Sequence, residues 1–223
     1  MFNIFFVQKK EMEIVIGFDF ECAGGIPEKH GFTQLGASAH ELDTGVCIGQ
    51  FNQYANMKGL EWEERCVREF WSRPDNQERY KETLEHVENA QFTCKEVVNQ
   101  FIAWAREISK GRKCVMISDN MIYDGGLIKY YSDVDIMYLL GERTVYFETA
   151  SVYYGMYMMH KLERLDKDSD DLSSKSIALA AASYAIKKEL EWPKTEVNHD
   201  HHPVHDAENM VLKWIFIQNS IKS

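Results

Sequence analysis

The sequence predicts one α/β domain in which a mixed β-sheet is flanked by α-helices. Residues 13–21 alternate between two faces as a buried strand does, and two β-rich runs, at 33–41 and 46–54, follow it. We expect these three strands to form an antiparallel meander. A long amphipathic helix then precedes a short apolar run at 113–118, which we expect to lie parallel to the first strand. A sheet that contains both kinds of pairing is mixed.

The elements between these strands follow from local signals. Residues 22–31 contain several Gly residues and a Pro, which indicates a loop. Residues 60–87 are charged and helical with a break at 73–75, and we place this helical hairpin at the surface. Thr93 is expected to cap the amphipathic helix, and Gly111 is expected to end it.

The second half of the chain is expected to be mainly helical. Residues 119–131 form a loop that leads into a helix, and residues 144–147 form another short strand. Further helices are predicted at 151–162 and 174–190, and a last apolar helix begins near Asp206.

Length and composition restrict the class of protein. The chain has 223 residues, which suits a single domain over residues 12–223, with residues 1–11 as an N-terminal extension. No segment approaches the ~18 apolar residues of a membrane span, so no membrane partner is expected. A formal net charge of -10 argues against broad attachment to long duplex nucleic acid. The five cysteines are scattered, which predicts no disulfide framework and a cytoplasmic, reducing setting.

Two acids end the first predicted strand. Asp19 and Glu21 lie on the same side of it, roughly 6 to 7 Å apart by the ~3.3 Å rise per residue. Carboxylates this close repel each other, so a cation or a shared proton must neutralise them. Oxygen ligands of this kind suit Mg²⁺ or Mn²⁺. The alternative is that two solvated acids end a strand at the surface.

A histidine-rich segment at 198–209 precedes and opens the last helix. Asp206 begins the face that Met210, Trp214 and Ile217 continue, which predicts a buried carboxylate in need of a partner. His201 lies in the preceding loop, within reach of the same pocket. Zinc is an alternative metal for this segment, with its histidines as ligands, although their spacing matches no common structural zinc site.

A third acid comes from the middle of the chain. Asp124 follows the strand at 113–118 and stands at the opening of a helix, where aspartate is also common as a cap. Asp119 is a competitor of Asp124 because it ends the same strand, but it is equally suited to capping the chain locally.

Three motifs, in this order, resemble those of the DEDDh 3′-to-5′ exonucleases, a superfamily of proofreading exonucleases and oligoribonucleases. They are Asp19-Phe20-Glu21, then Asn120 with Tyr123-Asp124, and then His201 with Asp206-Ala207. Residues 62–80 also resemble the Trp-Trp-x-x-Gln-Ser-Pro-Glu-Ala-Arg region of the phage-type exodeoxyribonucleases and a related bacterial exoribonuclease group. The resemblance covers residues 14–217.

The resemblance implies a ribonuclease-H-like fold and a metal-dependent 3′-to-5′ exonuclease. Its partners would be the 3′ ends of single-stranded RNA or DNA, from which it would release nucleoside 5′-monophosphates. Two divalent cations, Mg²⁺ or Mn²⁺, are implied about 3.5 to 4 Å apart, one to activate water and one to stabilise the leaving 3′ oxygen. The implied metal ligands are Asp19, Glu21, Asp124 and Asp206.

The resemblance also implies the remaining roles in the site. His201 would be the general base, because imidazole titrates near neutral pH, and His205 is the alternative. The terminal nucleotide would contact Cys22, Gly24, Gly25 and Asn120, mostly through the backbone, since residues 22–25 replace the small or hydroxyl residues usual in the family. Phe20 is expected to pack in the core instead.

Two other functions are compatible with these residues. One is a catalytically silent nucleic-acid-binding protein of the same fold, and the other is a hydrolase of small nucleotides with the same metal centre. RNA and DNA both remain open as substrates, since that choice rests on contacts to the 2′ hydroxyl. A homodimer is one option for the oligomeric state.

Overall fold

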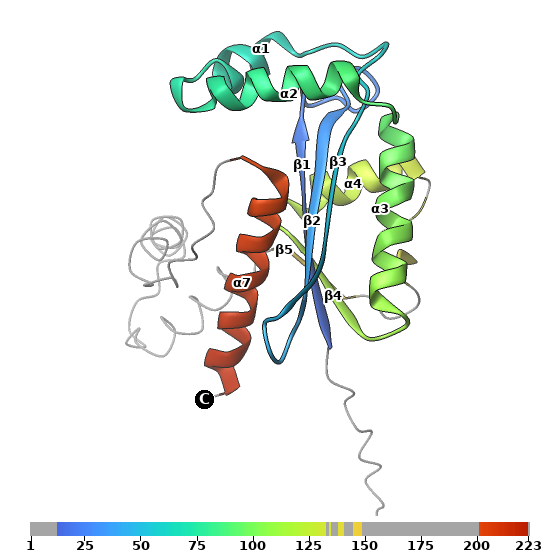
Figure 1. Ribbon diagram of the computed structural model, residues 1–223, viewed down its shortest axis with the longest axis vertical. Coiled ribbons are helices and arrows are strands. Elements are labelled where there is room, and N and C mark those ends of the chain that lie inside the picture. Colours follow the sequence, from blue (N-terminus) through green and yellow to red (C-terminus); the bar gives the residue numbers. More distant parts are fainter. Residues whose placement is uncertain (1–12, 133, 135–137, 141–144, 149–200, 223) are drawn as a thin grey trace, which may run out of the picture.

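One five-stranded sheet organises the part of the chain that the structure describes. The structure is a computed structural model that describes residues 13–132, 134, 138–140, 145–148 and 201–222. Within these residues the strand order is β3-β2-β1-β4-β5 (Figure 1). The strands are β1 (Ile14–Cys22), β2 (Phe32–Glu41), β3 (Cys47–Tyr54), β4 (Cys114–Ser118) and β5 (Val145–Glu148).

The pairing confirms the predicted mixed sheet. β1 and β2 are antiparallel, as are β2 and β3, so the predicted meander is present. β4 runs parallel to β1, with Gly17 opposite Ile117, and β5 runs parallel to β4. The parallel pair follows from the helical crossover between β3 and β4, which returns the chain to the starting end of the sheet.

The helices lie on both faces of the sheet and at one end of it (Figure 1). Thr93 and Glu96 form a capping box at the start of α3, as Thr93 was expected to do. The same helix ends in two left-handed residues, Lys110 and Gly111. The α-helices with described bounds are α1 (Glu64–Cys66), α2 (Gln77–Asn89), α3 (Cys94–Ser109), α4 (Met121–Ser132) and α7 (Pro203–Lys222).

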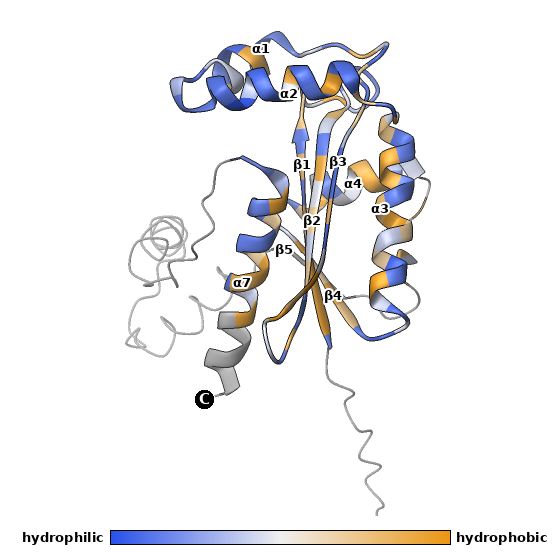
Figure 2. Cartoon of the chain, in the orientation of Figure 1, coloured by the Kyte–Doolittle hydropathy of each residue, from blue (hydrophilic) through white to orange (hydrophobic). Residues whose placement is uncertain are grey.

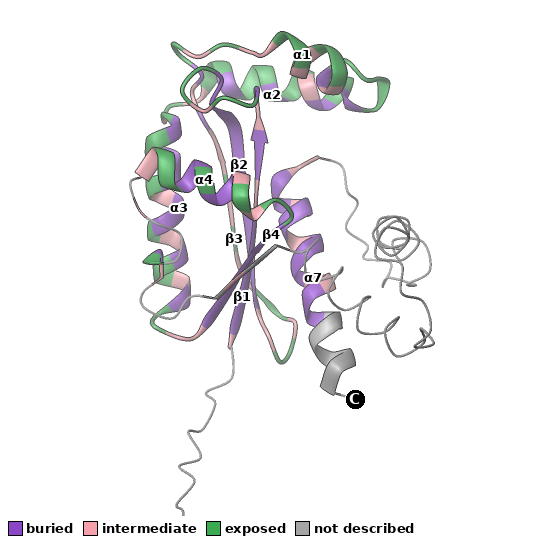
Figure 3. Cartoon of the chain, turned by 180° about the vertical axis from the view of Figure 1, so that it is seen from behind, coloured by how far each residue is buried: buried purple, intermediate pink, exposed green. Residues whose placement is uncertain are grey.

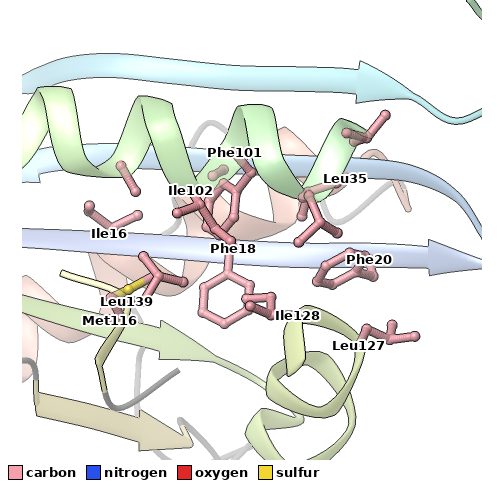
Figure 4. Close-up of a cluster of buried hydrophobic side chains, with 14 of the residues drawn as sticks. Ile16, Phe18, Phe20, Leu35, Phe101, Ile102, Met116, Leu127, Ile128 and Leu139 are labelled. Atoms are coloured by element: carbon pink, nitrogen blue, oxygen red, sulfur yellow. The ribbon is translucent and has the colours of Figure 1, made fainter. Parts of the chain in front are cut away.

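The two faces of β1 pack against different helices. Phe18 and its neighbours at every second position of β1 join the larger core with α3 and α4 (Figure 4). On the opposite face, Val15 joins Val115 and Ile117 of β4 against Val211 and Trp214 of α7. Figure 2 shows the apolar character of these packed surfaces. The predicted alternation of β1 is thus confirmed, and it leaves Asp19 and Glu21 on the α7 side of the strand.

Two glycines let α7 lie directly on the sheet. A Cβ atom on Gly17 would collide with the carbonyl oxygen of Ala207, and one on Gly36 would collide with the backbone of Pro203 and Val204. Any larger residue at either position would push the first turns of α7 away from β1 and β2. The glycines therefore determine how close the start of α7 comes to the acids of β1.

The segment between β3 and α3 is a helical hairpin across the end of β1 (Figure 1). It contains α1, a π-helical segment (Val67–Trp71), a 3₁₀ turn (Pro74–Asn76) and α2, and we refer to residues 64–89 as the helical insert. Most of it is exposed, as predicted (Figure 3). The prediction was incomplete, however, because Trp71 is fully buried and its indole N–H donates to the carbonyl oxygen of Cys22. The insert is thereby attached to the end of β1.

Several expectations concern residues that lie outside the described part of the chain. They are the N-terminal extension at 1–11 and the helices at 151–162 and 174–190. All five cysteines have free thiols. Among the described residues, no helix is both long and apolar enough to cross a membrane.

The close approach of α7 gives a stability prediction. Gly36→Ala should lower the free energy of unfolding by about 1 to 3 kcal/mol, because the new methyl group meets backbone that cannot rotate away. Thermal unfolding followed by circular dichroism measures the change. The matched control is Gly126→Ala in α4, where a Cβ would have no neighbour within 4 Å and should be neutral or stabilising. Equal melting temperatures for Gly36→Ala and the wild type would show that α7 does not need this glycine.

Candidate metal centre

The candidate centre begins at the end of β1, where the sheet places two carboxylates beside α7. Glu21 is buried and Asp19 is half-buried. Their partners on β2 are Gln34 and Gly36, so the side chains of β2 do not supply a positive charge to either acid. Other elements must therefore complete the neutralisation.

The structure brings two groups of three ligand atoms together at this end of the sheet. Glu21, His201 and Asp206 each contribute one ligand atom, and these atoms lie within 4.8 Å of one another. Asp19, Asp119 and Asp124 do the same within 4.8 Å. The residues come from β1, from the start of α4 and the turn before it, and from the start of α7 and the loop before it. All of the residues predicted as metal ligands, and His201, are in these two groups.

Asp119 was weighed in the sequence only as a competitor of Asp124, whereas the structure groups both with Asp19. The reason is the parallel register of β1 and β4, in which Gly17 lies opposite Ile117. Continued by two residues, that register sets Asp19 beside Asp119. The pairing of β1 with β4 is the signal that could have identified Asp119, and the sequence predicts that pairing without its register.

Burial makes these acids hard to ionise. The pKa of Asp19 is raised well above its ordinary value, first by burial and then by the charge of Glu21. Burial likewise raises the pKa of Glu21, and Asp206 raises it further, while the Arg79 guanidinium acts in the opposite direction. The pKa of Asp124 is raised to about 7 by burial, although the Ser118 hydroxyl donates a hydrogen bond to its carboxylate.

A divalent cation fits this donor set. Carboxylates with raised pKa values hold protons that a cation can replace, and hard oxygen ligands suit Mg²⁺ and Mn²⁺. Zinc was the alternative for the histidines of the C-terminal segment. In the part of the chain that the structure describes, His201 is grouped with two carboxylates instead of other histidines. His199 lies outside the described residues.

His201 and His205 occupy different surroundings. His201 is in the loop before α7, and its ring contacts the ring of Phe70 edge-to-face at a centroid distance of 4.9 Å. The backbone of His201 is left-handed, with φ 57°. The His205 ring instead stacks on the His202 ring at 4.5 Å, and it is in neither of the two ligand groups among the described residues.

The residues expected to contact a terminal nucleotide lie around the same end of β1. The carbonyl oxygen of Gly24 accepts a hydrogen bond from the Tyr123 hydroxyl at 3.0 Å, and the N–H of Gly25 donates to Glu63 at 3.1 Å. Gly24 is buried against His30 and Glu63, while Gly25 is exposed. The thiol of Cys22 has a pKa raised by burial. Asn120 is exposed beside Asp119, and Phe20 packs in the core as expected.

Known structures share this fold. No model of a protein family matches the sequence, and no curated protein matches it. The chain is similar to cell-death related nuclease 4, with a TM-score of 0.57 and 14% sequence identity. The match covers 94% of this chain and 64% of that nuclease. It is also similar to the nuclease domain of 3′hExo, a DEDDh family member, with a TM-score of 0.57 and 13% sequence identity. That match covers 94% of this chain and 93% of the 3′hExo chain. For exonuclease I the TM-score is 0.57 and the sequence identity is 13%. The match covers 93% of this chain and 41% of the exonuclease I chain. The chain therefore has the ribonuclease-H-like α/β fold expected from its sequence.

The raised pKa values give a prediction on pH and metal. In the metal-free protein, folded Asp124 keeps its proton up to about pH 7, whereas the unfolded chain loses it near 3.8. The folded state binds more protons between these values, so this group's contribution to stability falls as the pH rises through them. Mn²⁺ should therefore raise the melting temperature more at about pH 8 than at about pH 5, because at the lower pH it must displace protons. In Asp124→Asn the difference should shrink, and an equal Mn²⁺ effect at both pH values in the wild type would contradict the prediction.

Proposed function

We propose that this protein is a metal-dependent 3′-to-5′ exonuclease that acts on single-stranded nucleic acid or short oligonucleotides. One observation carries the proposal: the predicted ligands Asp19, Glu21, Asp124 and Asp206 converge with His201 at one end of the sheet. They do so on a fold shared with nuclease domains. The product would be a nucleoside 5′-monophosphate.

The acids would hold two divalent cations, either Mg²⁺ or Mn²⁺. When bound, the cations would supply Lewis-acid chemistry for the attacking water and the leaving 3′ oxygen. Asp206 and Glu21 would hold one side of the centre, and Asp19 and Asp124 the other, in line with the two groups of ligand atoms. Asp119 adds a further carboxylate to the second group.

His201 would remove the proton from the attacking water. The water oxygen forms a bond to phosphorus, the bond to the 3′ oxygen of the preceding nucleotide breaks, and that oxygen takes a proton from solvent. The imidazole of His201 is grouped with Glu21 and Asp206, which supports its role over that of His205. Because His201 lies in a loop, the residues around it determine where its ring points.

The terminal nucleotide would lie near Asn120 and the exposed Gly25, with Cys22 and Gly24 contributing through the backbone. Other proteins of this fold support such a ligand. The 3′hExo nuclease domain is known bound to rAMP, and E. coli exonuclease I is known in complex with an oligonucleotide (TM-score 0.52, 14% identity). The net charge of -10 favours short single-stranded ends over long duplexes. The free thiols suit a cytoplasmic setting.

Labelled oligonucleotides test the proposal. RNA and DNA oligomers labelled at either end should be shortened from the 3′ end with Mn²⁺ and left intact in excess EDTA. A 3′ phosphate should slow the reaction strongly, whereas a 5′ block should have no effect. Equal cleavage of circular and linear strands would show an endonuclease instead. Oligonucleotide binding without hydrolysis at any metal concentration would favour the catalytically silent alternative.

A histidine series tests the assignment of the base. His201→Ala should lower kcat by about 10² to 10⁴-fold, the usual contribution of a general base, while Mn²⁺ and oligonucleotide binding persist. Asp206→Asn should lower both Mn²⁺ affinity and kcat, because it removes a ligand. His199→Ala is the control and should stay near the wild type if its ring is solvated, whereas the His202 ring stacks on the His205 ring at 4.5 Å and is therefore not a neutral control. If His205→Ala were inactive and His201→Ala active, the assignment of the base would be wrong.

A further inference from the structure

One arginine of the helical insert is buried beside the candidate centre. Arg79 lies in α2 and only 8% of it is exposed, which is uncommon for an arginine. Its Nε–H donates to the backbone carbonyl oxygen of His201 at 3.2 Å. These two residues are 122 positions apart in the chain. The insert therefore makes a direct hydrogen bond to the loop that carries the candidate base.

The other nitrogens of Arg79 are held by the sheet and by its own helix. One Nη donates to the Tyr54 hydroxyl at 2.9 Å and lies 3.1 Å from a carboxylate oxygen of Glu82. The other donates to the side-chain oxygen of Gln34. Gln34 and Tyr54 are opposite each other on β2 and β3, so the pairing of these strands fixes the positions of both acceptors. The rigid, planar guanidinium of an arginine can connect two paired strands to a third element, here the loop that contains His201.

This arrangement separates positioning from substrate binding. An arginine that binds phosphate must present its N–H groups to the ligand, and each nitrogen of Arg79 already donates within the protein. Its burial leaves little of it for a nucleic acid to reach. The contacts instead direct the guanidinium at the backbone of His201.

The backbone of His201 is a place where such support matters. Its φ of 57° is in the left-handed region, which is unfavourable for a residue with a side chain and persists when neighbours hold it. Arg79 holds the carbonyl oxygen and Phe70 holds the ring, and both belong to the insert. The position of the imidazole thus depends on the insert as well as on α7.

We propose that Arg79 is a positioning residue, which fixes the backbone of His201 so that its imidazole stays beside Glu21 and Asp206. This inference rests on the proposed function, in which His201 is the general base. It gives the helical insert a role in the chemistry: contacts from the insert hold the backbone and the ring of the base in place. Arg79 acts on the base through the backbone of His201 and touches no reacting atom; its charge also opposes the rise in the pKa of Glu21, an effect that Arg79→Lys retains.

A double-mutant cycle tests this role. Arg79→Met removes the hydrogen bonds of the guanidinium and keeps an unbranched side chain. We expect kcat to fall about 10 to 100-fold with KM for the oligonucleotide within about threefold, because a base displaced by ~1 Å loses about that much. In the His201→Ala background, the same change should cost less than about twofold, since the group it positions is gone. Equal losses in both backgrounds would overturn the proposal.

Arg106 offers a matched control in another helix. Its Nε–H donates to the backbone carbonyl oxygen of Leu139 at 2.9 Å, so Arg106→Met removes the same kind of contact away from the centre. It should leave kcat within about twofold of the wild type. Arg79→Lys keeps the charge and loses the planar fork, and we expect a smaller loss of kcat that again disappears in the His201→Ala background. Arg79→Lys decides the question if Arg79→Met does not fold.

Amide hydrogen exchange in the metal-free protein separates this inference from the proposed function. Peptides that span residues 201–206 should exchange faster in Arg79→Met than in the wild type, and Arg106→Met should leave them unchanged. Unchanged exchange in Arg79→Met would overturn the positioning role whatever the activity. A wild type that degrades no oligonucleotide while Arg79→Met shows faster exchange would overturn the proposed function and retain Arg79 as the support of the His201 backbone.

Discussion

The close packing of α7 on β1 and β2 is the constraint on which the candidate centre depends. Gly17 and Gly36 remove the Cβ atoms that would keep the helix away from the sheet. The apolar residues of α7, among them Val211 and Trp214, then bury against Val15 and β4. Burying each such side chain contributes about 1.5 to 3 kcal/mol. The same contact that stabilises the domain thus carries Asp206 and His201 to the acids of β1.

This packing assembles charges that oppose one another. The pKa values of Asp19, Glu21 and Asp124 are all raised, chiefly because burial disfavours their ionised forms. The end of a sheet selected for stability alone would not gather five carboxylates in two groups, because each ionised acid makes the next harder to ionise. Local departures from stabilising rules are typical of functional sites. The core on both faces of the sheet offsets the repulsion, and a bound cation would relieve it.

The helical insert lies across the end of β1, which α7 does not cover (Figure 1). Its attachment uses polar groups as well as apolar ones: Trp71 donates to the backbone of Cys22, and Arg79 joins Gln34, Tyr54 and the backbone of His201. A charged helix is usually interpreted as a solvated surface element, and most of the insert agrees with that (Figure 3). Its buried arginine shows why the interpretation fails locally. A guanidinium can be buried when each of its nitrogens has an acceptor.

The sequence by itself determined the order and type of the described elements. The alternation of β1, the cap at Thr93 and the helical face of α7 are local patterns, because side-chain periodicity and capping depend on residues a few positions apart. The same patterns, with the motif resemblance, predicted the mixed sheet and the set Asp19, Glu21, Asp124, His201 and Asp206, which the structure brings together. Their roles as ligands and base remain predictions.

Only the tertiary structure decided which further residues share the centre. Asp119 joins Asp19 through the register of β1 and β4, and Arg79 reaches His201 across 122 positions. Neither contact leaves a local pattern, since a strand can pair in several registers and a helical arginine is normally solvated. Both follow from how the elements pack. The physical reason is that distances between remote residues are set by the sheet register and by the glycines under α7, which act only once the chain has folded.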